Sequence, residues 1–192
     1  DPGLTITTFP VALDVLTRSN VTIQSDGTTT ISGGVAGNGL VALNVSDIAI
    51  EGLNFANAQT SISLDTVTGG SITKCKILGG GVTLTGIIVE DCNDVVVGGP
   101  NSIDANVVTN CAVVGIAVNG GADNAVQHNL VGTDLANTAG IGCDVGVSVT
   151  GGAQNTRIED NTICTSVSKY AIQVDGASTT GVTITANRIG VA

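Results

Sequence analysis

The chain of 192 residues has no tryptophan, no methionine, one tyrosine and two phenylalanines. It is also poor in positive charge, because six Lys and Arg stand against sixteen Asp and Glu and leave a formal net charge of −10. A negative field of this kind opposes binding to phosphate backbones and to anionic lipid. We therefore expect no nucleic-acid partner. The scarcity of aromatic rings also removes the usual platform for a sugar ring.

Long apolar runs are missing too. None approaches the roughly 20 residues of a membrane-spanning helix, so no membrane insertion is expected. No stretch keeps the 3.6-residue apolar period of an amphipathic helix. The chain has instead 26 Val, 18 Ile and 25 Thr, whose β-branched side chains favour strands. This composition predicts an all-β protein.

One short pattern recurs along the chain: an apolar residue, two polar residues, Asn or Cys, any residue, and a second apolar residue. A second element, a small residue followed by apolar-x-apolar, precedes most copies by about ten residues, as in residues 115–118. Short strands that recur at this spacing predict a β-solenoid, whose successive coils pair as parallel strands. The full copies of the first pattern are residues 72–77, 108–113, 126–131, 158–163 and 184–189, and the imperfect copies are 50–55 and 89–94.

These repeats resemble those of right-handed parallel β-helix proteins of the pectin-lyase-like superfamily, and the likeness covers nearly the whole chain. Residues 19–33 are similar to the opening coils of many such proteins, and residues 131–140 look like a loop of repeat-rich microbial surface proteins. The resemblance implies a right-handed single-stranded parallel β-helix of eight or nine coils. We expect it to form one domain over residues 1–192, in an extracellular or cell-surface protein. The superfamily includes lyases, hydrolases, epimerases, tailspikes and adhesins, so the activity stays open.

Stacking the copies in register places the Asn or Cys slot in one inward column. An Asn side chain at a coil corner can bond to the backbone and to the Asn of the next coil, and Cys can replace it as a small residue that is easily buried. We therefore expect a structural ladder rather than a ligand site. Its expected members are Leu53, Cys75, Cys92, Cys111, Asn129, Asn161 and Asn187.

The cysteines and the single histidine, His128, form no CxxC motif and no Cys–His cluster. No metal site is therefore expected. The three cysteines of the ladder are expected to be buried free thiols. Cys143 and Cys164 lie outside the slot and one coil apart, which makes them candidates for a disulfide.

Carbohydrate-active β-helices need carboxylates clustered on an exposed strand face, usually with Arg or Lys and sometimes with calcium. The outward positions next to the ladder offer one polar patch over about four coils. Any β-helix needs polar residues in its outward columns, however, so such a patch is not specific to enzymes. The chain also has few Arg side chains that could bind an acidic polysaccharide. We expect no catalytic residue and no cofactor, and no motif supports calcium. The candidates, if the chain is an enzyme, are Asp91, Asp94, His128 and Lys74, with Glu90 and Asn110 nearby.

The expected function is a rigid, non-enzymatic structural or adhesive module with polysaccharide as a candidate partner. The first alternative is a carbohydrate-active enzyme, either a polysaccharide lyase, a hydrolase or an epimerase, or a carbohydrate-binding domain. The second alternative is ice or mineral binding through Thr-x-Thr ranks, although these ranks fall in different registers of the repeat. They are residues 5–7, 66–68, 83–85 and 183–185.

The two ends of the sequence show no capping helix or polar coil, although an open solenoid exposes unpaired strand edges. This favours a piece of a longer protein, with end-to-end stacking of copies as the alternative. Two sequons, at Asn20 and Asn44, are candidate glycosylation sites only in a eukaryotic secretory pathway.

Overall fold

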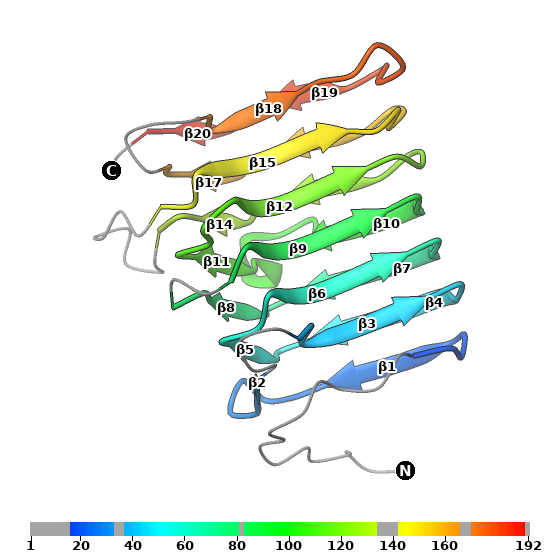
Figure 1. Ribbon diagram of the computed structural model, residues 1–192, viewed down its shortest axis with the longest axis vertical. Helices are drawn as coiled ribbons and strands as arrows, with labels where there is room; N and C mark the ends of the chain where they lie inside the picture. Colours follow the sequence, from blue (N-terminus) through cyan, green and yellow to red (C-terminus); the bar gives the residue numbers. More distant parts are fainter. Residues whose placement is uncertain (1–15, 33–36, 81–82, 134–141, 166–169, 191–192) are drawn as a thin grey trace.

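Successive coils of the chain stack along one axis and place their strands in three parallel sheets (Figure 1). Each strand pairs in parallel with its equivalent in the neighbouring coil. The computed structural model describes residues 16–32, 37–80, 83–133, 142–165 and 170–190. The expected right-handed parallel β-helix and its all-β class are confirmed.

Each coil crosses the three sheets in turn. Sheet 1 consists of β1 (Val21–Gln24), β4 (Ser46–Glu51), β7 (Thr68–Thr73), β10 (Asn93–Gly98), β13 (Ala125–Gln127), β16 (Arg157–Glu159) and β19 (Thr183–Thr185). Sheet 2 consists of β2 (Thr30–Ser32), β5 (Asn54–Ala56), β8 (Lys76–Leu78), β11 (Val107–Thr109), β14 (Leu130–Val131), β17 (Thr162–Ile163) and β20 (Arg188–Ile189). Sheet 3 consists of β3 (Leu40–Leu43), β6 (Thr60–Asp65), β9 (Thr85–Glu90), β12 (Val114–Asn119), β15 (Val145–Thr150) and β18 (Ile172–Val174).

The number of coils is lower than the sequence suggested. The described strands make about six turns, from β1–β3 to β16–β18, and β19 and β20 follow them, whereas eight or nine coils were expected. The repeat copies at 89–94 and 108–113 were counted as separate coils, but they lie at other corners of the same coils. The coils are correspondingly long: Ile48 pairs with Gly70, 22 residues on, and Ala125 pairs with Arg157, 32 residues on.

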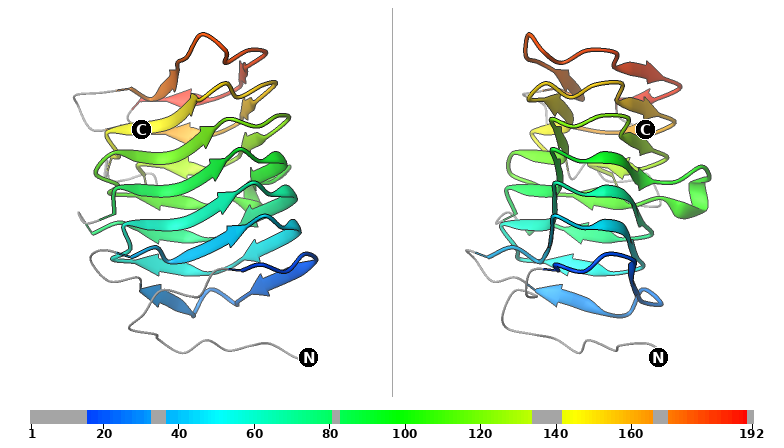
Figure 2. Two further views of the ribbon diagram at one scale, coloured as in Figure 1. Left: turned by 45° about the vertical axis from the view of Figure 1, so that its right-hand side comes forward. Right: turned by 90° about the vertical axis from the view of Figure 1, so that its right-hand side faces the viewer.

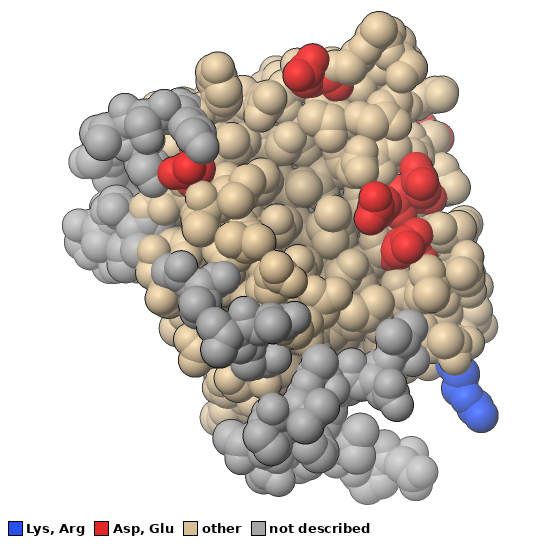
Figure 3. Space-filling view, viewed as in Figure 1, with Lys and Arg blue, Asp and Glu red and all other residues tan. Residues whose placement is uncertain are grey.

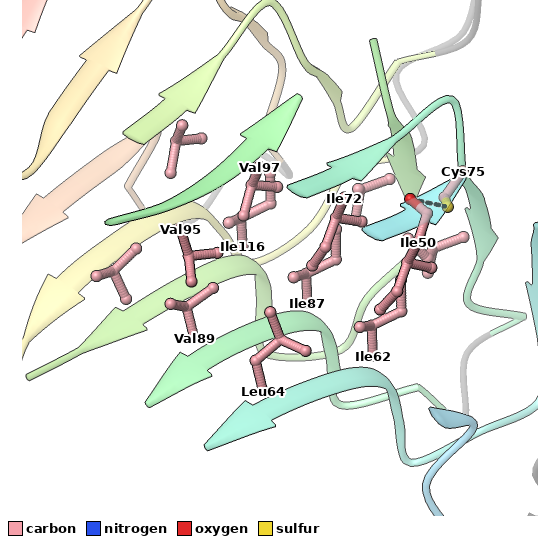
Figure 4. Packing of buried hydrophobic residues seen from close by; sticks show 14 of the residues in the cluster. Ile50, Ile62, Leu64, Ile72, Cys75, Ile87, Val89, Val95, Val97 and Ile116 are labelled. Carbon is pink, nitrogen blue, oxygen red and sulfur yellow. Dashed lines mark hydrogen bonds between the residues drawn. The ribbon is translucent and has the colours of Figure 1, made fainter. Parts of the chain in front are cut away.

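Aliphatic side chains from the sheets fill the interior of the solenoid (Figure 4). Ile62, Ile87 and Ile116 of sheet 3 stack in register on adjacent coils. Val95 and Val97 of sheet 1 point into the same core, and all five side chains are at most 1% exposed. Burying one such side chain contributes about 1.5–3 kcal/mol. These columns explain why the chain is so rich in Val and Ile.

Residues with a positive φ turn the corners of the coils. This left-handed conformation is unfavourable for most side chains and is best tolerated by Gly, Asn and Asp. Between sheets 1 and 2 the conformation is adopted by Gly52, Lys74, His128, Asp160 and Ala186. Asp91 and Asn110 adopt it at the other two corners. The same local pattern therefore serves all three corners, which is why the short sequence repeat could not tell them apart.

The connection between β10 and β11 leaves the body of the solenoid (Figure 2, right). It contains the 3₁₀ helix η1 (Ser102–Asp104), in which Ile103 is 75% exposed. The Lys74 backbone N–H donates to the Asp104 carbonyl at 3.1 Å, which ties this loop to the preceding coil. In the part of the chain that the structure describes, no helix is long and apolar enough to cross a membrane.

Candidate functional site

The most extensive buried polar network lies where sheet 1 turns into sheet 2. Asn129 donates its side-chain amide to the Val97 carbonyl at 2.8 Å and to Asn161 Oδ1 at 3.0 Å. Asn161 Oδ1 also accepts the Asn129 backbone N–H at 2.8 Å. Each amide thus joins the coil before it to the coil after it. We call this column the Asn corner, and its members are Leu53, Cys75, Asn106, Asn129, Asn161 and Asn187.

Two expected members of the ladder lie elsewhere. Cys92 lies between sheets 3 and 1, where its sulfur accepts the Val67 backbone N–H at 3.3 Å. Cys111 lies between sheets 2 and 3. The ladder contains Asn106 instead, whose Nδ2 is 2.9 Å from Asn129 Oδ1.

A sequence signal for Asn106 was present. Residues 103–108 match the repeat copy at 184–189, including the alanine before the asparagine. Asn106 precedes β11 just as Asn129 precedes β14, so the two coils place these side chains in one column. The ladder assignment for Cys92 and Cys111 was therefore wrong because the repeat identifies a corner but not which of the three corners it is.

The corner between sheets 2 and 3 carries two buried cysteines on adjacent coils. We call it the thiol corner and define it by Ala58, Thr83, Cys111 and Cys143. Cys111 precedes β12 and Cys143 precedes β15 on adjacent coils, and the Cys111 thiol donates to the Thr109 carbonyl at 3.7 Å. Both are buried, with 2% and 0% of their surface exposed.

All five cysteines lie in the described part of the chain, and all are buried free thiols. The expected disulfide between Cys143 and Cys164 is therefore not formed. The physical reason is direction: Cys164 Sγ is directed at the Gly190 carbonyl, 2.8 Å away, and not at Cys143.

The thiols differ in acidity because their surroundings differ. Burial raises the pKa of Cys75 to about 12 and that of Cys92 to about 11. The hydrogen bond with Cys143 raises the pKa of Cys111, and the same bond lowers the pKa of Cys143. Cys75 and Cys92 therefore stay protonated, whereas Cys143 loses its proton more readily than Cys111.

The four candidate catalytic residues do not form one site. Lys74 and His128 follow the ends of β7 and β13, at the Asn corner. Asp91 precedes β10 and Asp94 lies near its start. At about 3.3 Å per residue, the length of the sheet 1 strands separates the two groups by about 15 Å. Asn110 lies at the third corner. The polar patch inferred from the sequence is thus dispersed around the coil.

Charged groups beside the Asn corner are paired with neighbours instead. Lys74 Nζ is 2.7 Å from Glu51 Oε1, and this bond raises the pKa of Lys74. His128 Nδ1 is 2.8 Å from the Gly99 carbonyl, and its Nε2 is 3.9 Å from Asp160 Oδ2. This arrangement is typical of a solvated outer column with alternating charge.

The outer face of sheet 3 carries a small acidic group, of which the sequence indicated Glu90 but not Asp65 (Figure 3). Asp65 and Glu90 are register neighbours at the ends of β6 and β9. Asp65 Oδ1 accepts the Thr66 hydroxyl at 2.7 Å, and Glu90 Oε1 accepts the Asn119 amide at 3.1 Å. Among the residues that the structure describes, no three His, Cys, Asp or Glu side chains form a group that could hold a metal ion.

The Thr-x-Thr ranks and the sequons are scattered in the same way. Residues 66–68 lie at the corner before β7, 83–85 lead into β9, and 183–185 form β19, while 5–7 lie outside the described residues. The sequon residues Asn20 and Asn44 are exposed and have positive φ. The backbone conformation alone is therefore a sufficient reason for asparagine at both positions.

A family model described as "Periplasmic copper-binding protein (NosD)" matches residues 19–191. The chain belongs to the NosD family. No curated protein matches this NosD-family chain. Among solved structures, it is similar to the A-module of mannuronan C-5 epimerase AlgE4 from Azotobacter vinelandii, with 15% identity and a TM-score of 0.38. That match covers 91% of this chain and 54% of the epimerase chain.

The soft metal donors of this NosD-family chain are few. It has no methionine and one histidine, and the nearest polar partners of the His128 ring are an oxygen of Gly99 and one of Asp160. Cys75, Cys92, Cys111 and Cys164 each donate to a backbone carbonyl.

Proposed function

We propose that this NosD-family chain is a rigid, non-enzymatic β-helix module, structural or adhesive, of a protein exported to the periplasm or the cell surface. The observation that supports this proposal is the dispersal of Asp91, Asp94, His128 and Lys74 around the coil. The carboxylates of Asp91 and Asp94 lie at one end of the sheet 1 strands, whereas Lys74 and His128 lie at the other end, so neither candidate basic group lies beside the candidate carboxylates. A polysaccharide partner is then bound without being cleaved.

An activity screen tests this proposal. The intact chain is incubated with acidic and neutral polysaccharides in the presence of calcium, and the products are analysed for new reducing ends, unsaturated uronates and epimerised residues. We expect no turnover. Turnover that is lost in both Asp91→Ala and Asp94→Ala would overturn the proposal in favour of a carbohydrate-active enzyme. A sedimentation assay with the same polysaccharides tests binding separately.

A second candidate function is copper binding, which the description of the NosD family suggests. The donor set favours the reduced ion, because thiolates select Cu(I) and the chain has five free thiols but one histidine. The test is anaerobic equilibrium dialysis of the reduced chain against Cu(I). We expect bound copper at no more than one ion per chain, and a chain that takes up none contradicts this candidate.

A further inference from the structure

Four aspartate or asparagine residues of the chain are followed directly by glycine: Asp26, Asn38, Asn119 and Asp175. In such a pair the glycine nitrogen can attack the side-chain carbonyl carbon of the residue before it and close a five-membered succinimide ring. Glycine has no side chain to hinder this approach. From sequence chemistry alone the two asparagines react faster, because aspartate is ionised at neutral pH and an ionised carboxylate resists attack.

In the folded chain the glycine nitrogens of the two asparagine pairs are bound elsewhere. The Gly39 N–H donates to the Thr60 carbonyl at 2.8 Å, and the Gly120 N–H donates to the Thr150 carbonyl at 3.0 Å. Both bonds join adjacent coils. The stacking of the coils therefore holds these two nitrogens away from attack on their own side chains.

The Asp175–Gly176 pair has the opposite arrangement. It lies exposed on the turn between β18 and β19 (Figure 1, upper right). The Gly176 N–H donates to Asp175 Oδ1 at 2.7 Å. The carboxyl carbon is one bond from that oxygen, so the nitrogen lies close to the atom it would attack. Reactions proceed readily from such near-attack arrangements, in which the reacting atoms are about 3–3.5 Å apart.

Asp26 and Gly27 provide the matched pair within the same chain. Asp26 is exposed like Asp175, and Gly27 has a positive φ like Gly176. The Asp26 carboxylate, however, accepts the backbone N–H of Thr28 at 3.0 Å and also the Thr28 hydroxyl. The two Asp–Gly pairs thus differ in which backbone N–H the carboxylate accepts.

We propose that Asp175 is a site of spontaneous backbone modification, at which its bond to Gly176 isomerises through a succinimide to isoaspartate. The Gly176 nitrogen gives its proton to solvent and bonds to the Asp175 carboxyl carbon, and a carboxyl oxygen leaves as water with two protons from solvent. Water then adds to the former main-chain carbonyl carbon of Asp175, whose bond to nitrogen breaks. The nitrogen regains a proton and the new carboxylate releases one. The sum is the loss and regain of one water molecule, with no oxidant or cofactor.

The modification changes a turn that connects adjacent coils. The Thr179 hydroxyl donates to the Asp175 carbonyl at 2.8 Å and accepts the Gly152 N–H of the preceding coil at 3.2 Å. In isoaspartate that carbonyl group becomes a free carboxylate, and one methylene group enters the main chain. We therefore expect the contact between Thr179 and Gly152 to break.

The experiment compares the folded full chain with the same chain unfolded in guanidinium chloride, both incubated at neutral pH. Peptide mapping with electron-transfer fragmentation distinguishes isoaspartate from aspartate, and a mass gain detects deamidation of asparagine. In the unfolded chain Asn38 and Asn119 should react fastest. In the folded chain Asp175 should react fastest, at least about tenfold faster than Asp26, since a misplacement of 1 Å can cost about a hundredfold in rate.

Asp175→Glu is the control variant, because it keeps the charge but its longer side chain cannot close a five-membered ring. It should form no isoaspartate at this turn, and hydrogen exchange at Gly152 should stay slow, whereas exchange becomes faster as the native chain is modified. The proposal is overturned if Asp175 stays unmodified, if Asp26 reacts as fast, or if the folded chain follows the order of the unfolded chain. These comparisons use the native chain, so they decide even if the variant does not fold.

Discussion

The Asn corner and the thiol corner have the same backbone conformation but stack different side chains. In both, a residue with positive φ is followed by an inward side chain, as at His128–Asn129 and Asn110–Cys111. In the Asn corner the side chains form a continuous series of hydrogen bonds across coils. In the thiol corner the Cys111 thiol donates to the Thr109 carbonyl of its own coil at 3.7 Å, and glycines lie close to the sulfur atoms.

The difference follows from donor and acceptor capacity. An amide offers two N–H donors and a carbonyl acceptor, so one Asn can satisfy the coil before it and the coil after it. A thiol offers one weak donor and a weak acceptor. The Asn corner is therefore stabilised by directed bonds, and the thiol corner depends on close fit. Four predictions test this comparison, in order of decreasing effect.

The largest effect is expected for Asn161→Ala, which removes the donor to the Val126 carbonyl and the acceptor for the Asn129 backbone N–H. Leaving such buried groups unpaired costs about 1–3 kcal/mol each, so we expect a loss of about 3 kcal/mol in the free energy of unfolding. Urea denaturation followed by circular dichroism measures it. Asn187→Ala, in a half-buried position, is the control and should cost clearly less. Equal losses would contradict the ladder as the source of stability.

A smaller loss is expected for Gly115→Ala in the thiol corner. The added Cβ would lie 2.6 Å from Val131 Cγ1 and 2.7 Å from the Gly146 carbonyl. Overpacking of this kind typically costs about 1–3 kcal/mol, and we expect about 2 kcal/mol by the same measurement. Gly27→Ala measures backbone strain alone, because Gly27 has a positive φ and the added Cβ would have no atom within 4 Å, whereas Gly115 has no positive φ. A loss well below 1 kcal/mol for Gly115→Ala would show that close fit is not what the thiol corner requires.

The third prediction concerns pH and the lone thiol of the Asn corner. Burial raises the pKa of Cys75 to about 12, from 9.0 for an exposed thiol. The unfolded chain therefore loses this proton first as the pH rises. Stability that is complete below pH 9 should fall between pH 9 and 12, by up to about 1.4 kcal/mol per pH unit.

Urea denaturation of the reduced chain at pH 8 and pH 10 measures this slope. Cys75→Ser lacks the ionisable thiol and should show a shallower slope. A variant with an unchanged slope would show that Cys75 does not cause the loss.

The smallest effect compares Cys75→Asn with Cys111→Asn. At position 75 an amide would continue the ladder, because the Leu53 backbone N–H and Asn106 Oδ1 are already directed at this residue. We expect a gain of about 1 kcal/mol, the net value of a typical hydrogen bond. At position 111 the amide would meet Cys143 and the apolar core, so Cys111→Asn should destabilise the chain. Changes of the same sign would mean that the two corners do not differ as described.

Much of the local structure could be predicted from short stretches of sequence. The pattern at 126–131 and at 158–163 correctly predicted a corner followed by a buried Asn. Such a corner needs only one residue with positive φ and an inward amide next to it, and a few neighbouring residues determine both. The coil count and the membership of the ladder could not be predicted in the same way. Copies 89–94 and 108–113 satisfy the same local requirements at different corners.

The candidate site depended even more on the assignment of corners. Asp91 and His128 hold equivalent places in the repeat, yet they lie at opposite ends of the sheet 1 strands. Cys111 and Cys143 match no common motif, yet the register of β12 and β15 places them at the same corner of adjacent coils. Separation along the sequence carries little information here, because loops lengthen some coils and not others.

By itself, the sequence determined that this protein is a parallel β-helix with a Val- and Ile-rich interior and asparagine-lined turns, since these features depend on composition and on contacts within a few residues. Only the tertiary structure decided which corner each turn belongs to, and hence which side chains meet across coils. The physical reason is that stacking is set by the register of hydrogen-bonded strands 22 to 32 residues apart, as for Ile48 with Gly70 and Ala125 with Arg157.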